Sequence, residues 1–119
     1  MANTFKLVTK AGVTSADVIY TVAGSTTTVV LGIMLGNTTS SQITATVTIE
    51  SDTGNRSGSN DEANQNVELV TNAPIPSGAS LELLAGNKVI METTDVLKLT
   101  ASGATDIALS VMEIIICLM

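Results

Sequence analysis

The segment from Gln42 to Glu50 alternates apolar and polar side chains without a break. One set of positions is apolar and the other is threonine: Ile43, Ala45, Val47 and Ile49 against Thr44, Thr46 and Thr48. Because a period of two places successive side chains on opposite faces of an extended chain, this segment predicts a β-strand with one buried face. The threonines suit a solvent-exposed sheet surface, and they would also suit a face that meets another subunit.

The rest of the chain consists of short runs rich in Val, Ile, Leu and Thr, separated by Gly, Asn, Ser and Pro. We expect strands over 4–9, 17–22, 27–37, 42–50, 67–70, 80–84, 88–92, 95–101 and 106–116. Over 27–37 the chain is so apolar that burial on both faces is expected, with a bulge at Gly32. Pro74 and Pro76 predict a rigid turn over 73–78.

About eight or nine strands at short spacing, with no helix of ordinary length, predict an all-β fold. The pattern indicates an antiparallel β-sandwich of jelly-roll type, in one domain over 1–119. Aromatic residues make up only 2% of the chain, so the core must be aliphatic and its layers thin. Such a chain gains from subunit contacts, and we expect a homo-oligomer, most simply a trimer.

The residues that usually carry catalysis or bind metals are scarce. The chain has no His and no Trp, and it has one Cys, one Tyr and one Phe. No catalytic triad, GxSxG motif, phosphate loop or CxxC pair is present. Carboxylates that could form an acid–base pair are candidates by residue type alone: Glu82, Glu92, Asp95, Asp106 and Glu113. We therefore expect no enzymatic activity, no cofactor and no metal.

The C-terminal segment is apolar, and a monomer would expose it. Its residues are the candidate subunit interface: Ile114, Ile115, Ile116, Leu118 and Met119. Cys117 lies among them and is expected to be a buried, inert thiol. Glu113 interrupts the apolar run, and we expect it at a solvent- or subunit-facing rim, with pairing to a lysine as the alternative.

A polar loop is expected over 51–66, where one Ala is the sole apolar residue. Long loops of this kind are often functional, so it is a candidate docking element. The residues that would carry the contact are Asp52, Arg56, Asn60, Asp61 and Glu62. A calcium site is disfavoured, because Gly54 and Arg56 stand where an EF-hand loop needs ligands.

The formal net charge is −6, from 5 Lys and Arg against 11 Asp and Glu, and the basic residues form no stripe. Binding to nucleic acid or to an anionic membrane is therefore disfavoured. The apolar stretch over 107–119 is interrupted by Ser110 and Glu113 and is too short to cross a bilayer. The first twelve residues show no signal-peptide pattern, and a lone Cys suits a reducing compartment, so assembly in a cytoplasm is expected.

Four segments resemble those of small virion structural proteins of tailed bacteriophages, notably phages of marine cyanobacteria. They are VIYTVAG at 18–24 with TTVV at 27–30, LGIMLGN at 31–37, APIPSGASLEL at 73–83, and GNKVIMETTDVLK at 86–98 followed by SVMEI at 110–114. Two departures stand out: Ala23 replaces a proline that is usual in the family, and the chain continues beyond Ile114.

The resemblance implies a non-enzymatic virion component, with a capsid decoration or cement protein as the first reading. Its partner would be the major capsid protein or another virion protein, and its location the virion, after assembly in the host cytoplasm. A neck, tail or fibre component is the alternative within this class. A host-surface or carbohydrate-binding module is a third reading, and the shortage of aromatic stacking platforms counts against it.

Overall fold

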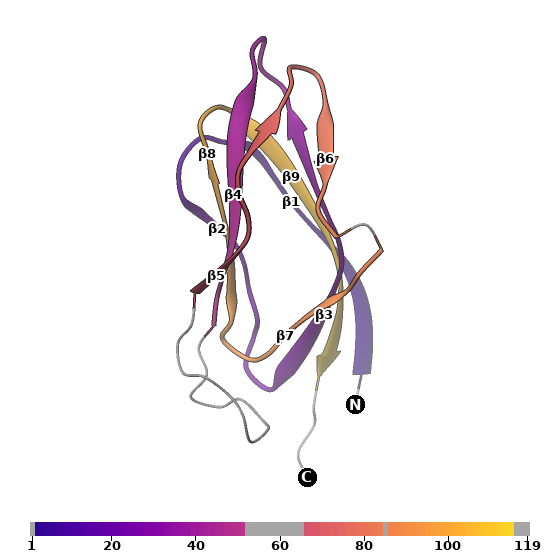
Figure 1. Cartoon of the computed structure of the whole chain (residues 1–119). Helices are drawn as coiled ribbons and strands as arrows, with labels where there is room; N and C mark the ends of the chain where they lie inside the picture. The colour runs from indigo at the N-terminus through magenta and orange to yellow at the C-terminus, as the bar shows by residue number, and fades with distance from the viewer. Residues whose placement is uncertain (1, 52–65, 85, 116–119) are drawn as a thin grey trace.

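The computed structural model describes residues 2–51, 66–84 and 86–115, and these form strands and connecting turns with no helix (Figure 1). The strands are β1 (Ala2–Val13), β2 (Asp17–Thr21), β3 (Thr26–Asn37), β4 (Ile43–Glu50), β5 (Asn66–Ile75), β6 (Ser80–Glu82), β7 (Val89–Met91), β8 (Val96–Ala101) and β9 (Thr105–Ile115). The candidate docking residues Asp52, Arg56, Asn60, Asp61 and Glu62 lie outside the described residues.

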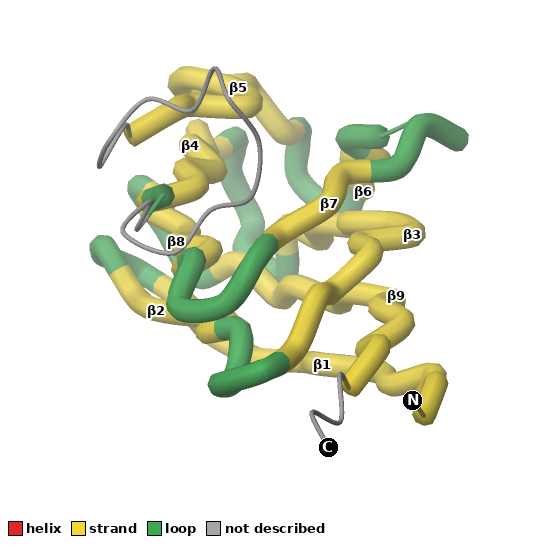
Figure 2. Tube along the Cα trace, turned by 90° about the horizontal axis from the view of Figure 1, so that it is seen from below, coloured by secondary structure: helices red, strands yellow, loops and turns green. Residues whose placement is uncertain are grey.

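Two antiparallel sheets face each other, and seen along the strands they form two separate layers (Figure 2). One sheet has the order β1-β9-β3-β6, with β7 also paired to β3, and the other has the order β2-β8-β4-β5. The chain crosses between the layers several times, with β4 and β5 together in one and β6 and β7 together in the other. β1 pairs with the last strand and β2 with the last but one. This order is the jelly-roll arrangement expected from the sequence.

The core is aliphatic, as the composition requires. From one layer the fully buried side chains include Val30, Ile33 and Leu109, and from the other Val47 and Leu99. In β4 the apolar positions face this core while the threonines face outward, so the period-two prediction for this strand is confirmed.

The bulge expected at Gly32 is present, because the pairing of β3 with β9 shifts register between Val30 and Gly32. The expected burial of this segment on both faces is wrong. Val30, Ile33 and Leu35 are fully buried, whereas Met34 is 48% exposed and Val29 is half-buried. A continuous apolar run does not show which side chains face the core, so the sequence could not show that one side of β3 lacks a covering layer.

Two predicted boundaries differ most from the structure. The turn expected over 73–78 begins later, because Pro74 belongs to β5 and pairs with Thr44. A proline can occupy this position because β5 is an edge strand, which need not donate a hydrogen bond on its free side. β1 is longer than expected over 4–9: it pairs with β9 from Ala2 to Val13, with a register shift after Lys10 and a positive φ of 68° at Gly12.

Candidate functional site

The outer face of the five-stranded sheet carries a row of large apolar side chains. Phe5 in β1 pairs with Met112 in β9, Met112 pairs with Val29 in β3, and Val29 pairs with Ile90 in β7. Paired residues in neighbouring strands lie side by side on the same face. These four residues therefore form one continuous row across four strands, and we call it the apolar row.

The apolar row is open to solvent in the isolated chain. Phe5 is 74% exposed and Ile90 is 65% exposed, while Met112 and Val29 between them are half-buried. Leu7, two residues along β1, is 66% exposed and pairs with Ser110, which in turn pairs with Gly32. Solitary exposed apolar residues are ordinary, but a contiguous set on one sheet face marks an interaction surface.

Charged residues are confined to the border of this face. The next row along the strands joins Thr9, Ala108 and Met34 to Glu82 in β6. The row after it contains Asp106, whose Oδ1 accepts a hydrogen bond from the Gly12 amide at 2.9 Å. The rows through Asn3, through Phe5 and through Leu7 thus present no charged side chain over β1, β9 and β3.

A shallow hollow lies beside the apolar row on the same sheet. It has a volume of about 410 Å³ and is open to solvent. Its wall includes Thr9, Met34, Gly36, Ser80 and Ala108, with the charged residues Lys10 and Asp106 at its far side. Small side chains at Gly36, Ser80 and Ala108 leave the space that larger residues would fill. The outer face therefore has a raised apolar part and a recessed part.

Polar side chains meet between the two sheets at the end of the sandwich where β9 finishes. Tyr20 in β2 donates its hydroxyl proton to Glu113 in β9, and Tyr20 lies 2.7 Å from the Thr28 hydroxyl. Because Tyr20 has one proton and a carboxylate only accepts, the Thr28 hydroxyl is the donor in the second bond. Lys6 Nζ completes the group at 3.3 Å from Glu113 Oε1.

Glu113 was expected at an exposed rim, with a lysine partner as the alternative. Its side chain is 13% exposed, faces the same side as buried Val111, and pairs with Lys6. The alternative describes this position better, because a carboxylate this far from water requires charged or hydrogen-bonding partners.

The pKa values of Tyr20 and Glu113 are both shifted away from neutral pH. Burial raises the pKa of Tyr20 to about 12, and the hydrogen bond to Glu113 adds to the rise. The hydrogen bond from Tyr20, followed by the contact with Lys6, lowers the pKa of Glu113 below its usual 4.5. A general acid or base works best with a pKa near the operating pH, so these shifts fit a structural tie between the sheets.

The residues proposed from sequence as a subunit interface are only partly described. Ile114 is half-buried on the outer face of the five-stranded sheet, paired with Asn3 and Thr27, and Ile115 is 39% exposed on the opposite side of the strand. Ile116, Leu118 and Met119 lie outside the described residues.

Sequence reasoning did not single out Phe5, Leu7, Met112 and Ile90 as a surface. The signal in the sequence was weak, because Phe5 and Leu7 alternate with Lys6 and Val8, and this pattern does not say which set faces inward. In the structure Val8 points toward the core and Phe5 and Leu7 point away from it.

Two common kinds of site are absent from the part of the chain that the structure describes. Over 2–51, 66–84 and 86–115 there is no helix long and apolar enough to cross a membrane. Within the same ranges no group of three or more Cys, Asp or Glu side chains is placed so that it could hold a metal ion.

No protein-family model matches the chain, and no curated protein matches it. Among solved structures, it is similar to a chain of the disulfide-linked pili that form Bacillus endospore appendages, with 14% identity, a TM-score of 0.48, and coverage of 98% of this chain and 88% of that one. It is also similar to a chain of the T13 viral particle of IBDV, with 9% identity and a TM-score of 0.44. That match covers 93% of this chain and 35% of the viral one.

Proposed function

We infer that this chain is a non-enzymatic structural component of a tailed-phage virion, and that it acts as a decoration or cement protein on the capsid. The observation that carries the structural role is the uncharged apolar surface on the outside of the five-stranded sheet. In a protein with a net charge of −6, the three uncharged rows across β1, β9 and β3 are suited to contact with protein. The virion assignment rests on the sequence resemblance.

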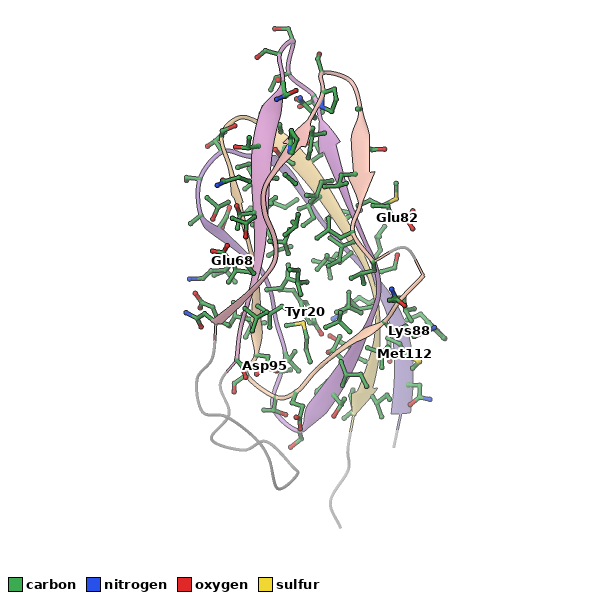
Figure 3. The ribbon with its side chains drawn as sticks, viewed as in Figure 1. Tyr20, Glu68, Glu82, Lys88, Asp95 and Met112 are labelled. Atoms are coloured by element: carbon green, nitrogen blue, oxygen red, sulfur yellow. The ribbon has the colours of Figure 1, made fainter. Side chains whose placement is uncertain are left out.

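The surroundings of the lone tyrosine disfavour the carbohydrate-binding alternative. A sugar-stacking platform needs an exposed aromatic ring, but Tyr20 is buried between the sheets, bonded to Glu113 and Thr28 (Figure 3). Phe5 is the other aromatic residue of the chain, and it lies within the apolar row. A surface with one phenyl ring among aliphatic neighbours fits a protein partner better than a sugar.

As a cement protein, the chain would stabilise a particle by binding across neighbouring capsid subunits. A partner that binds only the assembled state stabilises it by mass action, by about 2.7 kcal/mol per site at 100 times the dissociation constant. Many equivalent sites on a capsid would together raise its resistance to heat.

The test compares purified particles that contain this chain with particles from which its gene has been deleted. Mass spectrometry first establishes whether the chain is present in the particle, and its absence would refute the virion role. Heating then gives the temperature of genome release, which should be lower without the chain. Equal release temperatures would contradict the cement role and favour a neck, tail or fibre position, which electron microscopy of labelled particles would locate.

A further inference from the structure

The apolar row and the hollow lie on the same sheet, on either side of one intermediate row of residues. Ser110 in β9 and Gly32 in β3 form that row together with Leu7 in β1. Met112 lies two residues from Ser110 toward the C-terminal end of β9, in the apolar row. Ala108 lies two residues from Ser110 in the opposite direction and lines the hollow. The raised set and the recessed set thus lie at equal distances on the two sides of the row of Ser110.

We propose that this face binds the same face of a second copy of the chain, with the two sheets packed face to face and their strands antiparallel. In a two-fold contact, if residue i meets residue j, then j meets i. A half-turn about the row of Ser110 places the Met112 side of one copy over the Ala108 side of the other, twice in each dimer. The large side chains of one copy then occupy the hollow of its partner.

The area of the face is large enough for a second copy of the chain to bind. Strands lie about 4.8 Å apart and rise about 3.4 Å per residue, so the three long strands β1, β9 and β3, together with the short β6 and β7, present roughly 650 Å². Standard protein interfaces bury about 600–1,000 Å² on each partner. One copy of this sheet is therefore large enough to bind another without help from other surfaces.

Charge restricts which surfaces of two copies can meet. Each copy carries a net charge of −6, so two copies repel each other through most surfaces. The rows through Phe5 and Leu7 lack charge over three strands, with Glu82 and Asp106 at the border. Two copies can approach here without placing like charges in contact at the centre.

The outer side of β3 also lacks a covering layer. From Val29 to Leu35 the sequence of β3 is apolar apart from Gly32, as is typical of a strand covered on both sides, yet only its inner side is buried in the isolated chain. A second copy supplies the missing layer over Val29 and Met34. Because a two-fold contact closes at two copies, it gives a dimer in place of the trimer expected from the aliphatic composition and the apolar C-terminal segment.

Sedimentation of the purified protein across micromolar concentrations tests the pairing. Wild-type protein should dimerise, and the double variant Phe5→Thr/Leu7→Thr should raise the dissociation constant about a hundredfold or more. Threonine keeps a high strand propensity at both exposed positions. The matched control is Val18→Thr, at a 46% exposed position on the outer face of the other sheet, with a change of about twofold or less.

A second variant and a cross-link separate loss of contact from loss of fold. Ile90→Thr, on β7 at the other end of the apolar row, should weaken dimers independently, with circular dichroism confirming that each variant is folded. In a Cys117→Ser background, Ser110→Cys should cross-link with a short bis-maleimide, and exposed Thr100→Cys on the other sheet should not.

A monomeric wild type would overturn the proposal, and the face would then be open to a different virion protein. A dimer that survives the Phe5→Thr/Leu7→Thr change would place the contact elsewhere, and equal cross-linking at both cysteines would overturn the arrangement. All these measurements use protein in solution, so their failure is distinct from failure of the proposed virion role.

Discussion

The two sheets carry equivalent rows of four residues on their outer faces, one with four apolar side chains and the other with a single apolar side chain. Across β1, β9, β3 and β7 the row is Phe5, Met112, Val29 and Ile90. Across β2, β8, β4 and β5 it is Val18, Lys98, Thr48 and Glu68. Met112 and Glu68 lie on opposite sides of the molecule (Figure 3).

Both rows lie on paired antiparallel strands, so strand formation requires neither apolar side chains in the one row nor polar side chains in the other. A solvent-facing sheet surface is ordinarily polar, as in the row through Thr48. The apolar row therefore lowers the solubility of the free chain without adding to its own core, and a partner that covers it accounts for its composition. We therefore expect contact at the outer face of the five-stranded sheet and solvent at the outer face of the other.

The largest expected loss of stability is for a substitution on the core-facing side of β9, compared with one on its outer side. Leu109 is fully buried, and Leu109→Ala should lower the free energy of unfolding by about 3 kcal/mol through lost burial and a cavity. Met112→Ala, three residues along the same strand but on the outer face, should cost about 1 kcal/mol or less in dilute monomer. Urea denaturation measures both.

The same two variants can show that the outer face of the five-stranded sheet is not a free surface. If Met112→Ala destabilises the dilute monomer as much as Leu109→Ala, the outer face belongs to the core and is not a free surface. At high protein concentration the Met112 variant should lose more stability than in dilute solution, because dimerisation is coupled to folding.

The sequence predicts the architecture well because strand periodicity and turn residues are local. The threonine face of 43–50 is read directly from its alternation. The apolar face could not be predicted, because it depends on which strands lie beside β3 and on which side of β1 Phe5 points. Likewise, Tyr20 and Glu113 are 93 residues apart, and their contact arises only when β2 and β9 enter opposite sheets.

An intermediate effect is expected where the two sheets are tied together. Tyr20→Phe removes the hydroxyl that bonds Glu113 and Thr28, and should lower the free energy of unfolding by about 1–2 kcal/mol at pH 7. Thermal denaturation measures the loss. A variant as stable as the wild type would show that packing alone joins the sheets at this end.

The pH dependence of stability gives this tie a distinctive signature. Because the folded pKa of Tyr20 is raised to about 12 from 10, stability is retained below pH 10 and should decline by about 2 kcal/mol toward pH 12. Because the folded pKa of Glu113 is lowered, its contribution is present above its usual pKa and is lost as the pH falls below it. The Tyr20→Phe variant should lack the alkaline decline, and an identical decline in both proteins would contradict the assignment.

The smallest effect is expected on the threonine face, where charge stabilises weakly and should not contribute to pairing. Lys98 Nζ lies 2.8 Å from Glu50, and both side chains are about one-third exposed, so solvent screens their attraction. Lys98→Met keeps the aliphatic stem and removes the charge, and should change the free energy of unfolding by about 0.5 kcal/mol, less in high salt. Because this residue lies on the sheet that faces solvent, the dissociation constant of the dimer should stay within about twofold of the wild-type value. If Lys98→Met instead shifts the sedimentation profile as strongly as Phe5→Thr/Leu7→Thr, both faces take part in association, and the division between a contacting sheet and a solvated sheet is wrong.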